Sequence, residues 1–227
     1  MKNIYTVGLF AVILAFGWAQ DKDPKNQEMT TEQLIELLKK DEAKAKEVKW
    51  FLALQKYQKN LTEDDEGTME ISQMSITKGE KLLNNKYKFI KATDLKTRKT
   101  QTHAVTIDGK GEEISDEGTL VDMAKSAGFK LTKEEQAIEF AELCNKVVPV
   151  TKGGIGGIHI IGGMGTAEPE AEKTDDGWDV KFAIDKGHQK FGHIWHLKVN
   201  KDGKLTELER ENLGKHGWKK EFEFVPK

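Results

Sequence analysis

The chain of 227 residues contains one cysteine and four prolines, and it has no large excess of charge of either sign. A lone cysteine cannot form a disulfide within the chain, so side-chain packing must stabilise the fold. The 36 Lys and Arg residues nearly balance the 38 Asp and Glu residues, which gives a formal net charge of −2. Because nucleic-acid binding requires a basic surface, no nucleic-acid partner is expected.

Long hydrophobic runs are also scarce, and the clearest one lies at the N-terminus. It extends from Ile4 to Trp18 and ends before Ala19. A membrane-spanning helix needs about 20 apolar residues, whereas a shorter run before a small residue is typical of a secretory signal peptide. We expect residues 1–19 to be removed and residues 20–29 to form a polar leader. The mature protein is then secreted or periplasmic, without a membrane span.

Three segments have the apolar spacing of amphipathic helices: one that begins at Thr30, one from Ser115 to Gly128 and one from Thr132 to Val148. Thr132 and Glu135 have the spacing of a capping box. The third segment places Cys144 on its apolar face, which predicts a buried, unreactive thiol. The first segment carries two apolar rows, one of Leu34, Leu37, Leu38, Ala45, Val48 and Leu52, and one of Trp50, Leu54 and Tyr57.

Other segments alternate between apolar and polar residues, which is typical of β-strands with one buried face. The strands expected on this basis are 87–93, 102–107, 178–184, 191–199, 204–211 and 218–225. Residues 69–86 fit either a strand or a short helix, and the acidic segment 167–176 has the composition of a linker. The sequence therefore predicts an α+β fold, in which amphipathic helices pack on antiparallel sheets.

Two stretches, which start at Tyr87 and Val180, share one order of features. Each has an aromatic strand, a charged turn, a strand with histidine and an Asp-Gly-Lys turn. One interpretation is a pair of related helix-plus-sheet units, residues 30–114 and 115–227, with a Gly-rich insertion at 152–166 in the second. The other is that two unrelated β-meanders share similar turns.

The second unit, with its helix before the strands, resembles PepSY-like modules and, more loosely, the cystatin-like class. The resemblance is carried by Trp178 at the start of a strand, by the aromatic strand that follows, and by the turn from Asp202 to Lys204. It covers about fifty residues and implies a helix packed on a curled antiparallel sheet. It also implies an exported protein that binds or inhibits rather than catalyses. The Gly-rich and acidic insertion departs from that compact pattern.

The Gly-rich stretch KGGIGGIHIIGGMGT, residues 152–166, does not fit either nucleotide-binding motif. In a dinucleotide fingerprint the third glycine would stand at His159, and in a phosphate loop a lysine would stand at Met164. Backbone freedom combined with apolar side chains suits a connecting segment or an arm that contacts a partner. The candidate contact residues here are Ile155, His159, Ile160 and Met164.

Four of the six histidines lie in the last forty residues: His188, His193, His196 and His216. His193 and His196 are three positions apart on a predicted strand, so their side chains point to opposite faces and cannot chelate one ion as neighbours. No metal site is predicted. His193 shares its face with Trp195, and both are candidate contact residues for a ligand or partner.

The residues thus favour an exported, non-catalytic binding or inhibitory module that needs no cofactor. The expected partner is a protein or a small hydrophobic ligand. No nucleophile elbow or haem motif is present, and no catalytic residue is predicted. The alternative is a small-molecule- or metal-dependent enzyme that uses a cleft between helix and sheet in the C-terminal unit, with His193 and His159.

Overall fold

The computed structural model describes residues 41–63, 69–149, 169–186 and 189–212. Its helices are α3 (Glu42–Glu63), α4 (Thr77–Leu82), α5 (Glu117–Ser126) and α6 (Glu134–Val147). Its strands are β1 (Met69–Gln73), β2 (Tyr87–Asp94), β3 (Thr100–Thr106), β4 (Gly111–Glu113), β5 (Glu170–Lys173), β6 (Gly177–Lys186), β7 (Gln189–Val199) and β8 (Leu205–Asn212). The predicted signal peptide, the polar leader, the Gly-rich stretch and the strand predicted at 218–225 lie outside the described residues.

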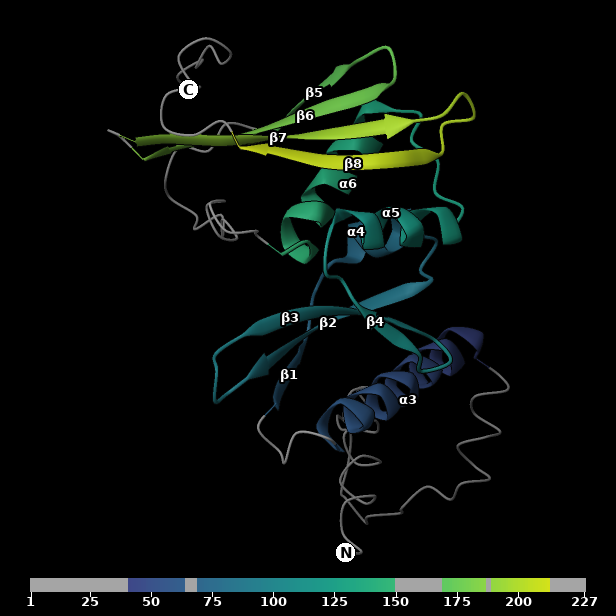
Figure 1. The fold of residues 1–227 in the computed structure, drawn as a ribbon. Helices are drawn as coiled ribbons and strands as arrows, with labels where there is room; N and C mark the ends of the chain where they lie inside the picture. Colours follow the sequence, from purple (N-terminus) through teal and green to yellow (C-terminus); the bar gives the residue numbers. More distant parts are fainter. Residues whose placement is uncertain (1–40, 64–68, 150–168, 187–188, 213–227) are drawn as a thin grey trace, which may run out of the picture.

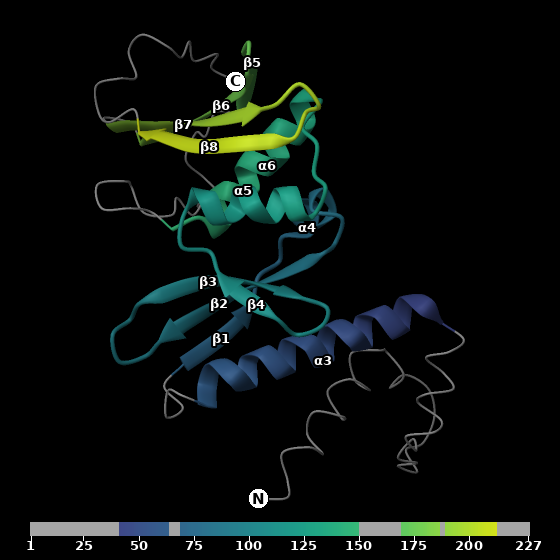
Figure 2. The same cartoon turned by 45° about the vertical axis from the view of Figure 1, so that its right-hand side comes forward.

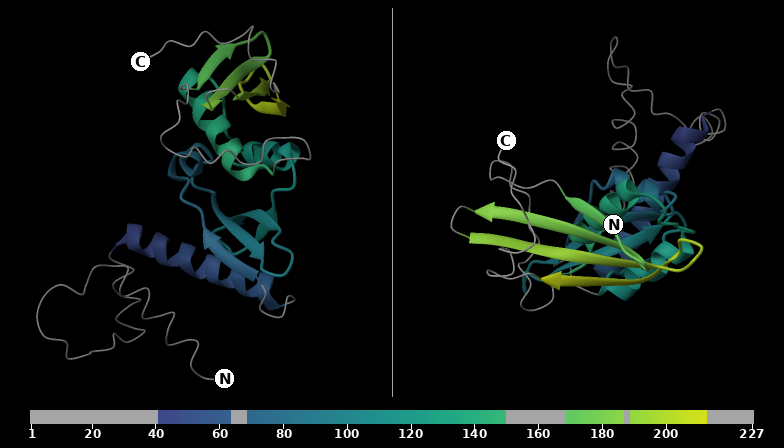
Figure 3. Two further views of the ribbon diagram at one scale, coloured as in Figure 1. Left: turned by 90° about the vertical axis from the view of Figure 1, so that its left-hand side faces the viewer. Right: turned by 90° about the horizontal axis from the view of Figure 1, so that it is seen from above.

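The described elements form four stacked layers. Two antiparallel four-stranded sheets, β1-β2-β3-β4 and β5-β6-β7-β8, lie on either side of a layer of helices α4, α5 and α6 (Figure 1). Helix α3 crosses the far face of the first sheet (Figure 2). The side view in Figure 3 shows the same succession of layers. The predicted α+β class, with helices packed on antiparallel sheets, is confirmed.

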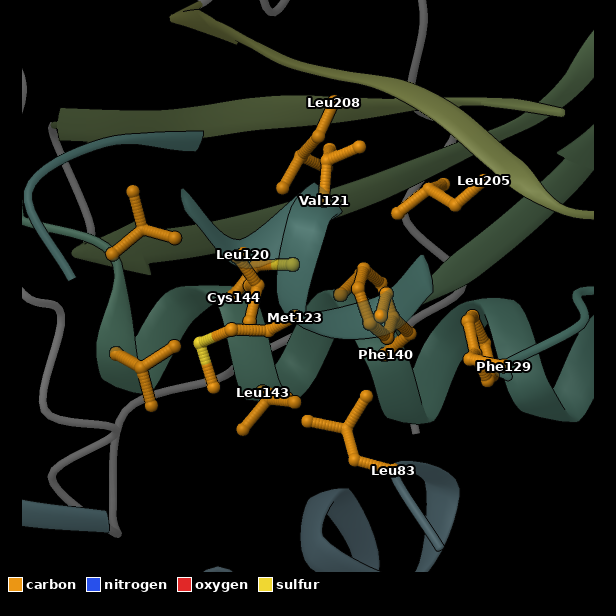
Figure 4. Packing of buried hydrophobic residues seen from close by; sticks show 14 of the residues in the cluster. Leu83, Leu120, Val121, Met123, Phe129, Phe140, Leu143, Cys144, Leu205 and Leu208 are labelled. Atoms are coloured by element: carbon orange, nitrogen blue, oxygen red, sulfur yellow. The ribbon is translucent and has the colours of Figure 1, made fainter. Parts of the chain in front are cut away.

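The central helices share one hydrophobic core with both sheets. In Figure 4, Val121 of α5 lies beneath Leu208 of β8, while Leu143 of α6 points the other way, toward Leu83. Helix α6 itself packs against α4 as well as against β5 and β6, so it buries residues on two sides, which explains why its apolar face is wide. Cys144 lies within this core with none of its surface exposed, as predicted.

Helix α3 packs on the first sheet through the second of its two predicted rows. Leu54 and Tyr57 contact Ile90 and Val105 in a small separate cluster. Leu52, expected on the buried row, is 56% exposed. Val48 of the first row is only 7% exposed, so that row is buried in part, while Leu34, Leu37 and Leu38 lie outside the described residues. The helical period alone cannot say how much of a row a neighbouring element covers.

Two other segments refine the sequence-based expectations. Residues 69–86, left open between strand and helix, contain one of each, β1 and α4. The acidic segment expected to be a linker contains β5, which pairs antiparallel with β6 from Glu170 opposite Lys181. An edge strand needs only one partner, so its polar residues face solvent and its composition resembles that of a loop.

The start of α6 also differs slightly from the predicted capping box. The side-chain oxygen of Gln136, rather than Glu135, accepts hydrogen bonds from the backbone N–H groups of Thr132 and Lys133, at 3.0 and 3.2 Å. The Thr132 hydroxyl donates to the same oxygen at 3.2 Å. The helix is therefore capped one residue later along the chain than the sequence pattern indicated.

Gly177 opens β6 at a point where two backbones approach closely. It pairs with Lys198, beside an irregularity in the register of β7 and β8, and a Cβ atom there would overlap the carbonyl oxygen of Leu197. We expect Gly177→Ala to lower the free energy of unfolding by about 2–3 kcal/mol, because backbone atoms must move to admit the methyl group. Urea denaturation measures the change.

The matched control is Gly118→Ala in α5, where the nearest heavy atom to an added methyl is a side-chain oxygen of Asp116 at 3.3 Å. Since alanine favours a helix, the control variant is expected to change the free energy of unfolding by less than about 1 kcal/mol. Similar changes in the free energy of unfolding for both variants would show that the backbone around Gly177 has room for a methyl group.

Candidate functional site

The two predicted contact residues of β7 lie together on the face of the second sheet that meets the helices. Alternation puts His193, Trp195 and Leu197 on this inner face, as expected from the sequence. The antiparallel register completes three rows across the sheet, which are Phe182–His193–Asn212, Val180–Trp195–Arg210 and Trp178–Leu197–Leu208. Trp195 has none of its surface exposed and His193 only 4%.

Asn145 of α6 joins these two side chains. Its amide oxygen lies 2.7 Å from Nε2 of His193 and 2.7 Å from Nε1 of Trp195. The indole nitrogen can only donate, so the oxygen of Asn145 accepts from it; the same oxygen then accepts from Nε2–H of His193. Nε2 of the imidazole therefore carries a proton.

Burial keeps His193 neutral. Removal from water and, as the smaller cause, the positive charge of Arg210 together lower the pKa of the imidazole to about 3. The ring stacks on Phe182 with centroids 5.2 Å apart, and it meets the edge of Trp195 at 6.3 Å. His193 is thus fixed in position and in protonation state around neutral pH.

Arg210 of β8 places its guanidinium over the indole of Trp195, with Cζ 5.6 Å from the ring centroid. This distance is within the range of a cation–π contact. The Nε atom of Arg210 is buried and has no hydrogen-bond partner. Burial lowers the pKa of the guanidinium, and the charge of Glu117 in the first turn of α5 opposes that shift.

The outer face of the same sheet is different in character. Nδ1 of His196 lies 2.9 Å from a carboxylate oxygen of Asp179, and Nε2 lies 3.3 Å from one of Glu211. Burial alone would lower the pKa of His196, but the two carboxylates raise it overall. Lys198 pairs with Glu207 on this face. The prediction that His193 and His196 point to opposite faces is confirmed.

The other four candidates, Ile155, His159, Ile160 and Met164, lie outside the described residues. Their role stays a prediction. The described residues before this stretch end at 149, two residues after the end of α6, and those after it begin at 169, just before β5. Glu170, the first residue of β5, pairs with Lys181, which precedes Phe182 in β6.

Two residues that contact His193 or Trp195, namely Asn145 and Arg210, are not among the predicted site residues. Asn145 follows Cys144 in α6, at the margin of the apolar face. The sequence pattern does not distinguish an amide in that place from an ordinary surface residue. Arg210 lies in an edge strand with alternating charges, and only the register with β7 brings it over Trp195. The signal that could have identified Arg210 is a polar residue at a strand position whose side chain points to the inner face of the sheet.

In the part of the chain that the structure describes, no three His, Cys, Asp or Glu side chains gather as a metal site would require. The helices within these ranges include none that is long and apolar enough to cross a membrane. The chain matches no family model, no curated protein and no solved structure.

Proposed function

We propose that the chain is an exported, non-catalytic binding or inhibitory module that contacts its partner through the inner face of sheet β5–β8. The contact surface is the end of that face around Phe182, His193, Trp195 and Arg210, which is named the inner-face cluster below. Phe182 and Arg210 are each half-buried, whereas His193 and Trp195 are buried. Export rests on the predicted signal peptide.

One observation carries the non-catalytic part of this proposal. His193 is buried, and with a pKa of about 3 it is a weak base at neutral pH. General acid–base catalysis works best when the pKa lies near the working pH. Its Nε2 proton is also committed to Asn145. The residue is therefore suited to holding a surface in place rather than to transferring protons.

The composition of the cluster supports a role in binding. Arginine is among the residues most enriched at the energetic centres of protein interfaces, and Arg210 keeps part of its surface exposed. Here the indole is fully buried and held by Asn145, so the groups around it are already ordered. Such preorganisation lowers the entropic cost of binding.

The test is capture of the partner by the tagged mature chain from the culture supernatant and envelope of the host. Phe182→Ala removes an aromatic ring from the cluster, and Glu209→Ala changes the opposite face of the sheet as a control. The partner is expected to co-purify with the wild-type and Glu209→Ala proteins and to be lost with Phe182→Ala, while thermal unfolding confirms that both variants are folded. Retention by folded Phe182→Ala would contradict the assigned surface.

A further inference from the structure

We infer that Arg210 anchors a site for a single carboxylate group carried on an apolar body. The inference rests on the proposed binding function and names the chemistry of the ligand. It follows from three features of the inner-face cluster and its neighbours. Arg210 has no ion-pair partner among the described residues. The NH2 group of Asn145 makes no hydrogen bond to His193 or Trp195, and Phe182 provides an aromatic surface nearby.

Arg210 forms no salt bridge with a carboxylate of the described residues. Its Nε–H is buried and makes no hydrogen bond. Glu117 acts on it through its charge, without a hydrogen bond between the two side chains. A buried donor without a partner costs free energy, and more so when it is part of a charged group. A carboxylate bound by the guanidinium would neutralise this charge, because the guanidinium fork matches a carboxylate; the buried Nε–H becomes accessible to it only when the Arg210 side chain shifts.

Asn145 has further hydrogen-bond donors, which lie near the same indole. Its oxygen accepts from both His193 and Trp195, so its NH2 group is directed away from the two rings. Asn145 meets the edge of the indole while Arg210 covers its face. The side chains that border the indole thus offer hydrogen-bond donors from Asn145 and Arg210, while Glu117 brings one negative charge into the same region.

The surroundings select the class of anion. One guanidinium matches the single charge of a carboxylate, whereas a phosphate monoester carries nearly two charges at neutral pH and would leave one unmatched. Phe182 stacks on His193 across the same face, so an apolar group attached to the carboxylate has an aromatic surface to contact. Both a free aromatic acid and the C-terminus of a peptide that ends in an apolar residue have this chemistry.

The test follows the indole N–H resonance of Trp195 in the 15N-labelled full-length mature chain, assigned with Trp195→Phe. The probes are 3-phenylpropionate and 3-phenylpropionamide, which differ in charge but hardly in shape. The acid is expected to shift the Trp195 resonance in a saturable way. The amide is expected to bind at least roughly tenfold more weakly. Equal binding of acid and amide, or no binding of the acid, would overturn the inference. This comparison needs no substitution that could disturb folding.

Variants locate the anion. Arg210→Gln should weaken binding of the acid roughly tenfold, and Glu117→Gln should strengthen it about threefold because a competing negative charge is removed. Glu209→Gln makes the same change of charge on the outer face and should leave the affinity within about twofold. If Glu117→Gln and Glu209→Gln have the same effect, the acid binds elsewhere and the site is wrong.

A second pair of probes distinguishes the two sources of the carboxylate. A short peptide that ends in Phe is titrated as the free acid and as the C-terminal amide. Tighter binding of the peptide acid than of 3-phenylpropionate identifies a chain terminus as the ligand, and the reverse identifies a small acid. If no carboxylate binds but capture of the partner still depends on Phe182, the inference fails and the proposed function stands. If the acid binds but capture does not depend on Phe182, the proposed function fails.

Discussion

Acidification from pH 7 to pH 4 is expected to lower the free energy of unfolding by about 3 kcal/mol through His193 alone. The folded-state pKa of this residue is about 3, against 6.5 for an exposed histidine. Between these values the unfolded chain binds a proton that the folded protein does not. The stabilisation is therefore complete above pH 6.5 and is lost as the pH falls toward 3, at about 1.4 kcal/mol per pH unit.

The contribution of His193 is isolated by comparison with His193→Gln, which keeps a hydrogen-bond donor for Asn145 but does not titrate. Urea denaturation is measured for both proteins between pH 7.5 and pH 4. Other histidines contribute to the wild-type profile: burial lowers the pKa of His103, whereas the pKa of His196 is raised. These contributions cancel in the difference between the two proteins. A difference that does not change with pH would show that His193 is not held neutral.

Trp195→Ala is expected to lower the free energy of unfolding by about 3–5 kcal/mol, the range for removing a large aromatic side chain from a core. Trp195 is fully buried in the main core cluster, and its loss also removes a donor from Asn145 and the ring beneath Arg210. The structure thus assigns this indole both a packing role and a role in ordering the cluster.

Trp195→Phe separates the two roles. Phenylalanine retains most of the apolar volume but cannot donate to Asn145, so the expected cost is about 1–2 kcal/mol. Chemical denaturation at pH 7.5 gives both values. Trp178→Phe serves as the control, since Trp178 lies on the same face but is only partly buried. A Trp195→Ala cost no larger than the change caused by Trp178→Phe would contradict the central position of the indole.

The periodicity of the sequence predicted most of the regular elements because each has one buried face. The alternation around Trp178 and His193 identified β6 and β7, and the apolar face of α6 placed Cys144 correctly in the core. It could not identify β5, an edge strand with polar side chains, nor decide which row of α3 meets the first sheet. Those outcomes depend on which elements become neighbours, which is not a local property of the sequence.

The arrangement of the two sheets shows the same limit. In the first half of the described chain, α4 falls between β1 and β2, whereas α5 and α6 both precede β5 in the second half. The interpretation as two related units rested on similar strands and turns, and it stays a prediction. One continuous core joins both sheets to α6, so the two halves share their buried surface.

For the candidate site, alternation brought His193 and Trp195 to one face. The partners that determine their chemistry came from elsewhere. Asn145 lies 48 residues before His193, and the contact of Arg210 with the indole depends on the β7–β8 register. Sequence patterns assign residues to faces, but long-range contacts fix the tautomer and the pKa of a histidine.

The protonation state of His193 tests the central claim, that this cluster is a fixed contact surface and not a proton-transfer site. It is measured directly by 15N NMR of the imidazole of His193 as a function of pH. We expect the neutral tautomer with the proton on Nε2 from pH 8 down to about pH 4, since the pKa is about 3. A titration midpoint near 6.5, or a proton on Nδ1, would contradict it.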